Sequence, residues 1–234
     1  MSRNYSFTVC PEDLDGGGTV TIPAFYRKLI SSIGWDIKRQ GFGVDVMARK
    51  GLTWVLARCA FEFARRPELY EPVKVSVWSS SSSGLLQDRC LKATDASGGT
   101  LCNGVTQWCV LSKDTRRPVV MDMPECDPLD LPCDPPRRLG AFQTDHLHER
   151  QVGYSECDFN GHLNNSRYVE SFFDLLPSCV AQALRPVRLD VHFKKEIPLG
   201  GKILSCIRQA GESAFDFLMS HEGRVACLAS LALL

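Results

Sequence analysis

The sequence predicts an α+β protein made of two similar halves, each with one helix packed on an antiparallel sheet. Three observations predict this fold: a helix-like segment occurs twice, a strand-like segment recurs behind each copy, and a proline-rich stretch separates the copies. With 234 residues, 44% of them hydrophobic, the chain can form one large domain or two of roughly 100 to 120 residues.

The first predicted helix begins after Thr21 and has Pro23 in its first turn. Threonine is a favoured N-cap, and proline is tolerated at the first helical positions because the N–H that it lacks has no partner there. The apolar residues that follow have the spacing of an amphipathic helix. They are Phe25, Tyr26, Leu29, Ile30 and Ile33.

The rest of the first half is predicted to form strands. Residues 54–63, 73–78, 85–94 and 100–111 are rich in β-branched and aromatic side chains, and turn-forming residues at 79–84 and 95–99 separate them. The segment 122–138 then carries five prolines, too many for a helix or a central strand. We therefore predict a domain at 1–121, a proline-rich linker at 122–138 and a second domain at 139–234.

The second half repeats the first. A helix is predicted between the candidate caps Asn164 or Asn165 and the helix-breaking Pro177, with five apolar positions at a constant offset of 143 from those of the first helix. These are Tyr168, Val169, Phe172, Phe173 and Leu176. A second match has a constant offset of 130: Phe61, Phe63, Arg65, Arg66 and Leu69 correspond to Val191, Phe193, Lys195, Glu196 and Leu199. Strands are predicted at 151–155, 187–195, 202–209, 214–220 and 224–233.

A polar motif, Asp-Phe-Asn-Gly-His-Leu-Asn-Asn at 158–165, directly precedes the second helix. If it is extended, Asp158, Asn160 and His162 lie on one side, beside helix N–H groups that could stabilise an oxyanion. A capped turn also requires Asp, Asn and Gly, but it does not require an imidazole, whereas acid–base chemistry does. A calcium loop is excluded because Leu163 and Val169 occupy its required glycine and acidic positions.

The repeat shows that this polar set occurs once. At the same offsets, Asp158 matches Asp15, but the other three polar residues have no equivalent: Asn160 matches Gly17, His162 matches Thr19, and Glu196 matches Arg66. A set present in one half only suggests a chemical site in the second half and a binding role for the first.

Charge and composition exclude several classes of protein. Lys plus Arg equals Asp plus Glu, 27 each, so no overall charge favours nucleic acid. No apolar run approaches the length of a membrane span, about 18 residues. The eleven cysteines have no zinc-site spacing and no secretory leader precedes them, so we expect no metal, reduced thiols and a cytoplasmic location.

Nearly the whole chain resembles the acyl-acyl carrier protein (acyl-ACP) thioesterase family. The segment 152–168 is similar to its Asp-x-Asn-x-His-x-Asn-Asn motif, and 192–196 to its later aromatic-x-x-Glu; segments 51–58, 108–111 and 115–118 also match. The resemblance implies two tandem hotdog domains, each a long central helix wrapped by an antiparallel β-sheet. It also implies that the first domain binds the acyl chain and the second is catalytic.

The resemblance implies hydrolysis of a fatty acyl thioester on acyl carrier protein, which terminates fatty acid synthesis, with Asp158, Asn160, His162 and Glu196 as catalytic residues. Which of Glu196, Asp158 and His162 is the general base stays open. Some family members carry a cysteine after the glutamate, where this chain has Ile197, so attack by water is favoured over an acyl-cysteine.

The candidate acyl-chain contacts are Phe25, Leu29, Ile33 and Trp54, although apolar helix stripes are more often ordinary core. No cofactor is expected, because the substrate carries the phosphopantetheine arm. Two alternatives are an acyl-CoA thioesterase of the same fold and a non-catalytic acyl-binding protein. A monomer and a homodimer are both compatible with the sequence.

Overall fold

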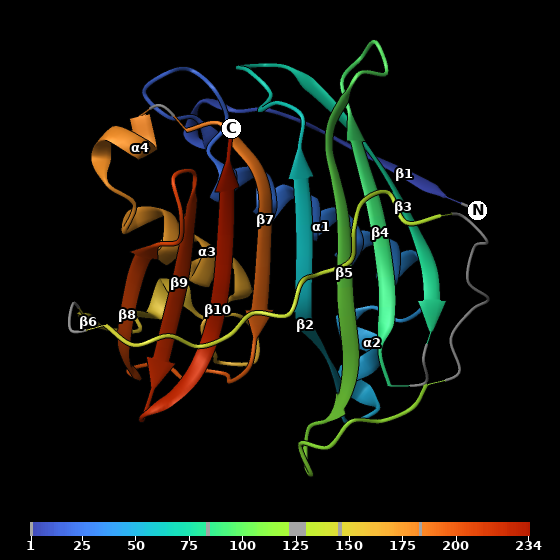
Figure 1. The fold of residues 1–234 in the computed structure, drawn as a ribbon. Helices are drawn as coiled ribbons and strands as arrows, with labels where there is room; N and C mark the ends of the chain where they lie inside the picture. The colour runs from blue at the N-terminus through green and yellow to red at the C-terminus, as the bar shows by residue number, and fades with distance from the viewer. Residues whose placement is uncertain (1, 83–84, 122–129, 145–146, 183) are drawn as a thin grey trace. The chain divides into compact units, whose positions relative to one another are not determined.

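The structure is a computed structural model that describes all residues except 1, 83–84, 122–129, 145–146 and 183 (Figure 1). Its contacts divide the chain into unit 1, Met1–Pro136, and unit 2, Arg137–Leu234. Part of the predicted linker, 122–129, lies outside the described residues, and residues 130–138 contain no helix or strand.

Unit 1 consists of one long helix and a five-stranded antiparallel sheet. The helix α1 is Ile22–Arg39, and the sheet has the order β1-β3-β4-β5-β2. The strands are β1 Arg3–Thr8, β2 Leu52–Phe63, β3 Pro72–Ser82, β4 Gln87–Thr94 and β5 Thr100–Ser112. A 3-10 turn, Pro11–Asp13, precedes α1, and the short helix α2, Val44–Arg49, follows it.

The local sequence explains where α1 begins and which face it buries. The Thr21 hydroxyl accepts a hydrogen bond from the Ala24 N–H at 3.3 Å, and proline lies in the first turn, as predicted. The apolar stripe faces the sheet, where α1 contacts β1, β3 and β4. Phe25, Leu29 and Ile33 are all 0% exposed, so the stripe forms the core of unit 1.

Unit 2 repeats this arrangement with a shorter helix. The helix α3 is Asn165–Asp174, and the sheet order β6-β8-β9-β10-β7 matches that of unit 1 strand for strand. The strands are β6 His148–Gln151, β7 Pro186–Phe193, β8 Lys202–Gln209, β9 Ala214–His221 and β10 Arg224–Leu233. A 3-10 turn, Tyr154–Glu156, precedes α3, and the short helix α4, Ser178–Gln182, follows it.

The predicted fold class is confirmed. Each unit has the helix and antiparallel sheet of a hotdog domain, and the internal repeat found in the sequence corresponds to two sheets of equal topology. Asn164 is the N-cap of α3, and the helix ends before Pro177. No described helix is both long and apolar enough to cross a membrane.

Some element predictions were wrong. The segment 151–155 is not a strand: β6 ends at Gln151, and residues from Tyr154 form the 3-10 turn. The edge strand β1 and the two short helices were not predicted. The two helices are too short to show a helical period. In β1, however, Tyr5 and Phe7 alternate with polar residues, a period-two signal that was overlooked.

Residues 130–142, which connect the two units, pack on the sheet faces. In unit 1, Cys133 packs against the buried cluster of Trp78, Cys90 and Val105. In unit 2, Leu139 and Phe142 cover the cluster of Cys206, Leu218 and Leu228. The Arg137 N–H also donates to Asp190 Oδ1 at 2.9 Å, and the Arg137 carbonyl contacts the His192 ring. Side chains from this segment thereby help to bury the second face of each sheet.

Candidate active site

The polar motif forms a tight turn directly before α3, which is the second of the two backbone forms that the sequence left open. The Gly161 N–H donates to the Asp158 carbonyl at 3.0 Å, and the Asp158 N–H donates to the His162 carbonyl at 2.8 Å. Gly161 has φ +77°, a left-handed conformation that ends any strand alternation. The alternation argument that placed Asp158, Asn160 and His162 on one side was therefore wrong, although the turn still gathers the three residues.

Asp158 holds this turn with one carboxylate oxygen. Its Oδ1 accepts hydrogen bonds from the Asn160 N–H at 2.8 Å and the His162 N–H at 3.4 Å. Aspartate is favoured in turns because its side chain can accept from backbone groups two residues on. Asp158 thus has a structural role in addition to any chemical one.

Unit 1 contains the same turn. Asp15 Oδ1 accepts from the Gly17 N–H at 2.9 Å and the Thr19 N–H at 3.3 Å, and Gly18 has φ +80°. The other carboxylate oxygen, Oδ2, is paired with the Arg66 guanidinium. The backbone role of the aspartate therefore belongs to the repeat, whereas the charge beside it differs between the units.

Glu196 completes the candidate site in unit 2. Its Oε2 lies 3.6 Å from His162 Nδ1, which is a polar contact too long for a hydrogen bond. The two side chains are 36% and 29% exposed, so solvent reaches both. The backbone fixes their approach, since the Leu163 N–H donates to the Ile197 carbonyl at 2.8 Å and His162 bridges to Pro198.

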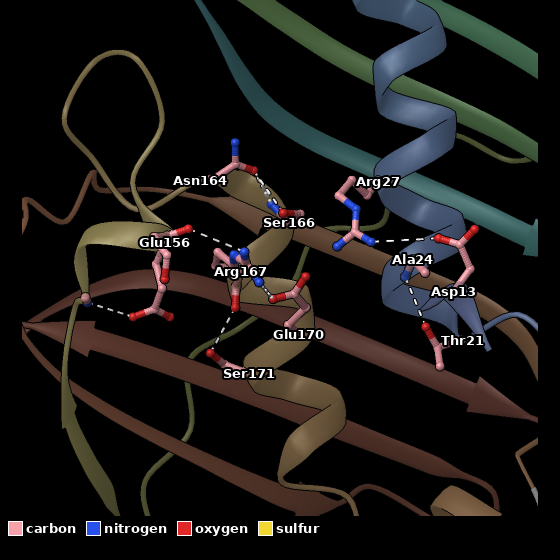
Figure 2. Close-up of polar contacts among 12 residues, drawn as sticks. Asp13, Thr21, Ala24, Arg27, Glu156, Asn164, Ser166, Arg167, Glu170 and Ser171 are labelled. Atoms are coloured by element: carbon pink, nitrogen blue, oxygen red, sulfur yellow. Dashed lines mark hydrogen bonds and ion pairs between the residues drawn. The ribbon is translucent and has the colours of Figure 1, made fainter. Parts of the chain in front are cut away.

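The predicted oxyanion site at the start of α3 is not supported. The Ser166 N–H donates to the Asn164 side-chain oxygen at 2.9 Å, and the Arg167 N–H donates to the Asn164 carbonyl at 2.9 Å (Figure 2). The cap that starts the helix thus occupies these donors. The side-chain amides of Asn160, Asn164 and Asn165 and the His162 imidazole are the other groups of this motif that carry hydrogen-bond donors for developing negative charge.

An ion-pair and hydrogen-bond network around Glu156 and Arg150 lies next to the turn in the sequence. Glu156 Oε2 accepts from the Arg150 guanidinium and from the Gly153 N–H, both at 2.8 Å, and Arg150 also donates to the Ser171 hydroxyl at 2.9 Å. Burial would raise the pKa of Glu156, but these donors hold it below its usual value. Because the Asn164 N–H donates to the Glu156 carbonyl, the network is connected to the helix cap.

The predicted acyl-chain residues all lie in unit 1. Phe25, Leu29 and Ile33 are buried on the core face of α1, and the Phe25 ring lies 6.3 Å from that of Phe7. The Trp54 indole N–H donates to the Phe42 carbonyl at 2.9 Å. Its ring lies 6.5 Å from that of Trp108. Their predicted contact with substrate stays a prediction.

A groove of about 860 Å³ lies between β1 and α1 in unit 1. Four basic residues line it, Arg27, Lys28, Lys38 and Arg39, and none of the eight predicted site residues does. Among the residues that the structure describes, no three His, Cys, Asp or Glu side chains are grouped so that they could hold a metal ion.

The two helix-on-sheet units define a tandem hotdog protein. It has one candidate polar site, because the set of carboxylate, amide and imidazole side chains occurs in the second unit alone. Comparison with known families gives the particular group. Residues 2–128 match the acyl-ACP thioesterase N-terminal domain, and residues 141–230 match the acyl-ACP thioesterase C-terminal domain. The chain belongs to the acyl-ACP thioesterase family.

Individual relatives agree with this assignment. A palmitoyl-acyl carrier protein thioesterase of the chloroplast from Gossypium hirsutum is 25% identical over 174 residues, which cover 67% of this chain and 41% of the relative. A dodecanoyl-[acyl-carrier-protein] hydrolase from Umbellularia californica is 22% identical over 78% of this chain and 53% of the relative. The chain thus spans about half the length, or less, of the curated relatives that it matches.

Solved structures show the same fold over the full chain. An acyl-ACP thioesterase from Bacteroides thetaiotaomicron has a TM-score of 0.92 and 25% identity, covering 100% of this chain and 98% of that one. A 12:0-ACP thioesterase from Umbellularia californica has a TM-score of 0.86 at 17% identity, with 100% and 97% covered. The second likeness supports the fold alone.

Proposed function

We propose that the protein hydrolyses fatty acyl thioesters carried by acyl carrier protein, which releases a free fatty acid and the holo carrier protein. The observation that carries this proposal is the contact of His162 with Glu196 beside the Asp158 turn, in unit 2 alone. Family membership supports the choice of a thioester as substrate.

The proposed chemistry uses water as the nucleophile. Glu196, with His162 beside it, takes a proton as the water oxygen forms a bond to the thioester carbon. The proton passes from Glu196 to His162, and when the carbon–sulfur bond breaks His162 gives it to the thiolate of the phosphopantetheine arm, so that both side chains return to their starting state. General acid–base catalysis of this kind typically contributes about 10²- to 10⁴-fold in rate.

In this scheme, the Asn160 side chain donates hydrogen bonds to the oxyanion that develops on the thioester oxygen. The α3 donors Ser166 N–H and Arg167 N–H are already bonded to Asn164, whereas a side-chain amide can donate two hydrogen bonds. Asp158 orders the turn that presents Asn160 and His162. The acyl chain is assigned to unit 1.

Hydrolysis assays with the same acyl chain on acyl carrier protein and on coenzyme A test the proposed carrier. We expect a higher kcat/KM with the carrier protein, and repeating the assay from short to long chains would give the chain-length preference. A higher kcat/KM for the coenzyme A thioester would instead identify an acyl-CoA thioesterase.

The enzyme claim itself is tested with Asp158→Ala. We expect this variant to lose most of the thioester hydrolysis, because Asp158 orders the turn and charges the site. If the purified wild type bound acyl carrier protein but hydrolysed nothing above background, and Asp158→Ala left this unchanged, the protein would be a non-catalytic acyl-binding protein.

Three further statements stay predictions: the cytoplasmic location, the lack of a cofactor and a monomeric or homodimeric state. The plant relatives named above include chloroplast proteins. Gel filtration with light scattering would determine the oligomeric state directly.

A further inference from the structure

Tyr168 links helix α3 to the segment that carries Glu196. Its side chain is buried, at 4% exposure, and its hydroxyl donates to the Lys195 carbonyl at 3.2 Å. Its ring packs edge-on against Phe193 with centroids 5.5 Å apart. Glu196 follows Lys195 directly. The Tyr168 side chain therefore binds the backbone one residue before the candidate carboxylate.

Unit 1 contains the same aromatic pair without the hydroxyl. In the repeat, Tyr168 corresponds to Phe25 and Phe193 to Phe63, and the rings of Phe25 and Phe63 lie 6.2 Å apart. The ring pair therefore belongs to the fold of both units. The hydroxyl occurs only in the unit that has Glu196, whereas Arg66 stands at this position in unit 1.

The backbone of both segments is otherwise held in the same way. In unit 1 the Ala64 and Arg65 N–H groups donate to the Leu101 carbonyl. In unit 2 the Lys194 and Lys195 N–H groups donate to the Ala226 carbonyl. Since unit 1 folds without a hydroxyl at this point, the extra bond in unit 2 is not a requirement of the strand end.

The electrostatic surroundings of Tyr168 keep its hydroxyl a neutral donor. Burial is the largest cause that raises the pKa of Tyr168 far above its usual value, and the negative charges of Glu196 and Asp158 raise it further. The hydroxyl therefore lies within electrostatic reach of both candidate carboxylates. As an O–H that does not ionise, it donates to the Lys195 carbonyl throughout the working pH range.

We propose that Tyr168 is a positioning residue for Glu196. The Tyr168 hydroxyl fixes the segment Lys195–Glu196 and so holds the Glu196 carboxylate beside His162. The consequence for catalysis rests on the proposed function. The hydrogen bond itself does not depend on that function. Sequence reasoning assigned Tyr168 only to the apolar helix stripe, and the Tyr-for-Phe difference within the repeat was the signal that it did not use.

Tyr168→Phe tests the proposal because it removes the hydroxyl and keeps the ring. Hydrogen–deuterium exchange should become faster in residues 194–199, and kcat on acyl-acyl carrier protein should fall about 10-fold with KM near the wild-type value. Tyr5→Phe is the matched control, since the Tyr5 hydroxyl donates to Asp36 in unit 1 at 3.0 Å. It should leave kcat and the exchange of residues 194–199 unchanged.

A double-mutant cycle separates positioning from a general loss of stability. If Tyr168 acts through Glu196, then Tyr168→Phe should lower kcat much less in the Glu196→Gln background than in the wild type. Additive losses of kcat, or a lower Tm with unchanged kcat and exchange, would overturn the proposal. Faster exchange in residues 194–199 of a protein whose wild type hydrolyses nothing would sustain the positioning role and contradict the proposed function.

Discussion

At the scale of single residues, the two aspartates Asp15 and Asp158 separate a structural role from a chemical one. Each accepts hydrogen bonds from two backbone N–H groups and closes the same turn. Asp15 also pairs with Arg66, which compensates its charge, whereas Glu196 stands at the position of Arg66 in unit 2. Two differences, Glu196 for Arg66 and His162 for Thr19, thus replace a compensated pair with two carboxylates and an imidazole.

The role of Asp158 in the turn predicts different stabilities for two substitutions. Asp158→Asn keeps a side-chain oxygen for the Asn160 and His162 N–H groups, so the free energy of unfolding should change little. Asp158→Ala removes that acceptor and should lower the free energy of unfolding by about 1 kcal/mol. Urea unfolding measures both, and equal losses for the two variants would contradict the structural role.

The residues of the candidate site could be found from the sequence, but their geometry could not. Comparison of the repeats identified Asp158, Asn160, His162 and Glu196 because three of the four have no counterpart in unit 1. The sequence left the backbone open between an extended segment and a capped turn because a glycine permits both, and the structure shows the turn, with φ +77° at Gly161. The sequence also did not show that Asn164 accepts hydrogen bonds from the first N–H groups of α3, because a candidate cap residue does not reveal which donors it binds.

At the scale of elements, the two long helices show how much local sequence determines. Caps, first-turn proline and apolar period predicted α1 and α3, and the structure confirms both. The short helices were missed because five or six residues carry too little periodicity to indicate a helix. Their formation depends on the sheet and core around them. The strand β1 was missed although Tyr5 and Phe7 alternate with polar residues.

The two caps should contribute equally to their helices. Asn164→Ala removes the acceptor for the Ser166 N–H and hydroxyl, and Thr21→Ala removes the acceptor for the Ala24 N–H (Figure 2). Each change should lower the free energy of unfolding by about 1 kcal/mol. Chemical denaturation is the measurement, with Ser31→Ala on the exposed face of α1 as the control. A cap variant that unfolds like the control would refute the assigned cap.

At the scale of the whole molecule, several acidic groups depend on hydrogen bonds formed by the folded chain. The Arg65 guanidinium lowers the pKa of Glu71, and the Ser97 hydroxyl together with Arg65 lowers the pKa of Asp95 to about 2. For Asp15, burial opposes the shift, but hydrogen bonding and charge from Arg66 still lower its pKa. Folding therefore favours the ionised form of these groups.

These shifts predict a loss of stability in acid. A carboxyl group whose pKa is lower in the folded state stabilises the fold above its unfolded pKa of about 4, and this contribution disappears as the pH falls through the folded value. The Tm should therefore decrease steadily from pH 5 towards pH 2. Asp174 acts in the opposite direction, because burial and the Glu170 charge raise its pKa. A Tm that stayed constant down to pH 2.5 would contradict this prediction.

The central claim is that chemistry belongs to unit 2 and that the matching positions of unit 1 do not carry it. The most direct test is the kcat of acyl-acyl carrier protein hydrolysis for Glu196→Gln and for its repeat counterpart Arg66→Gln, with Tm as the check on folding. We predict that Glu196→Gln lowers kcat by about 10²-fold or more. Arg66→Gln, which breaks the pair with Asp15 and the hydrogen bond to the Val20 carbonyl, should leave kcat near the wild-type value. Equal kcat values for the two variants, in folded protein, would contradict the claim.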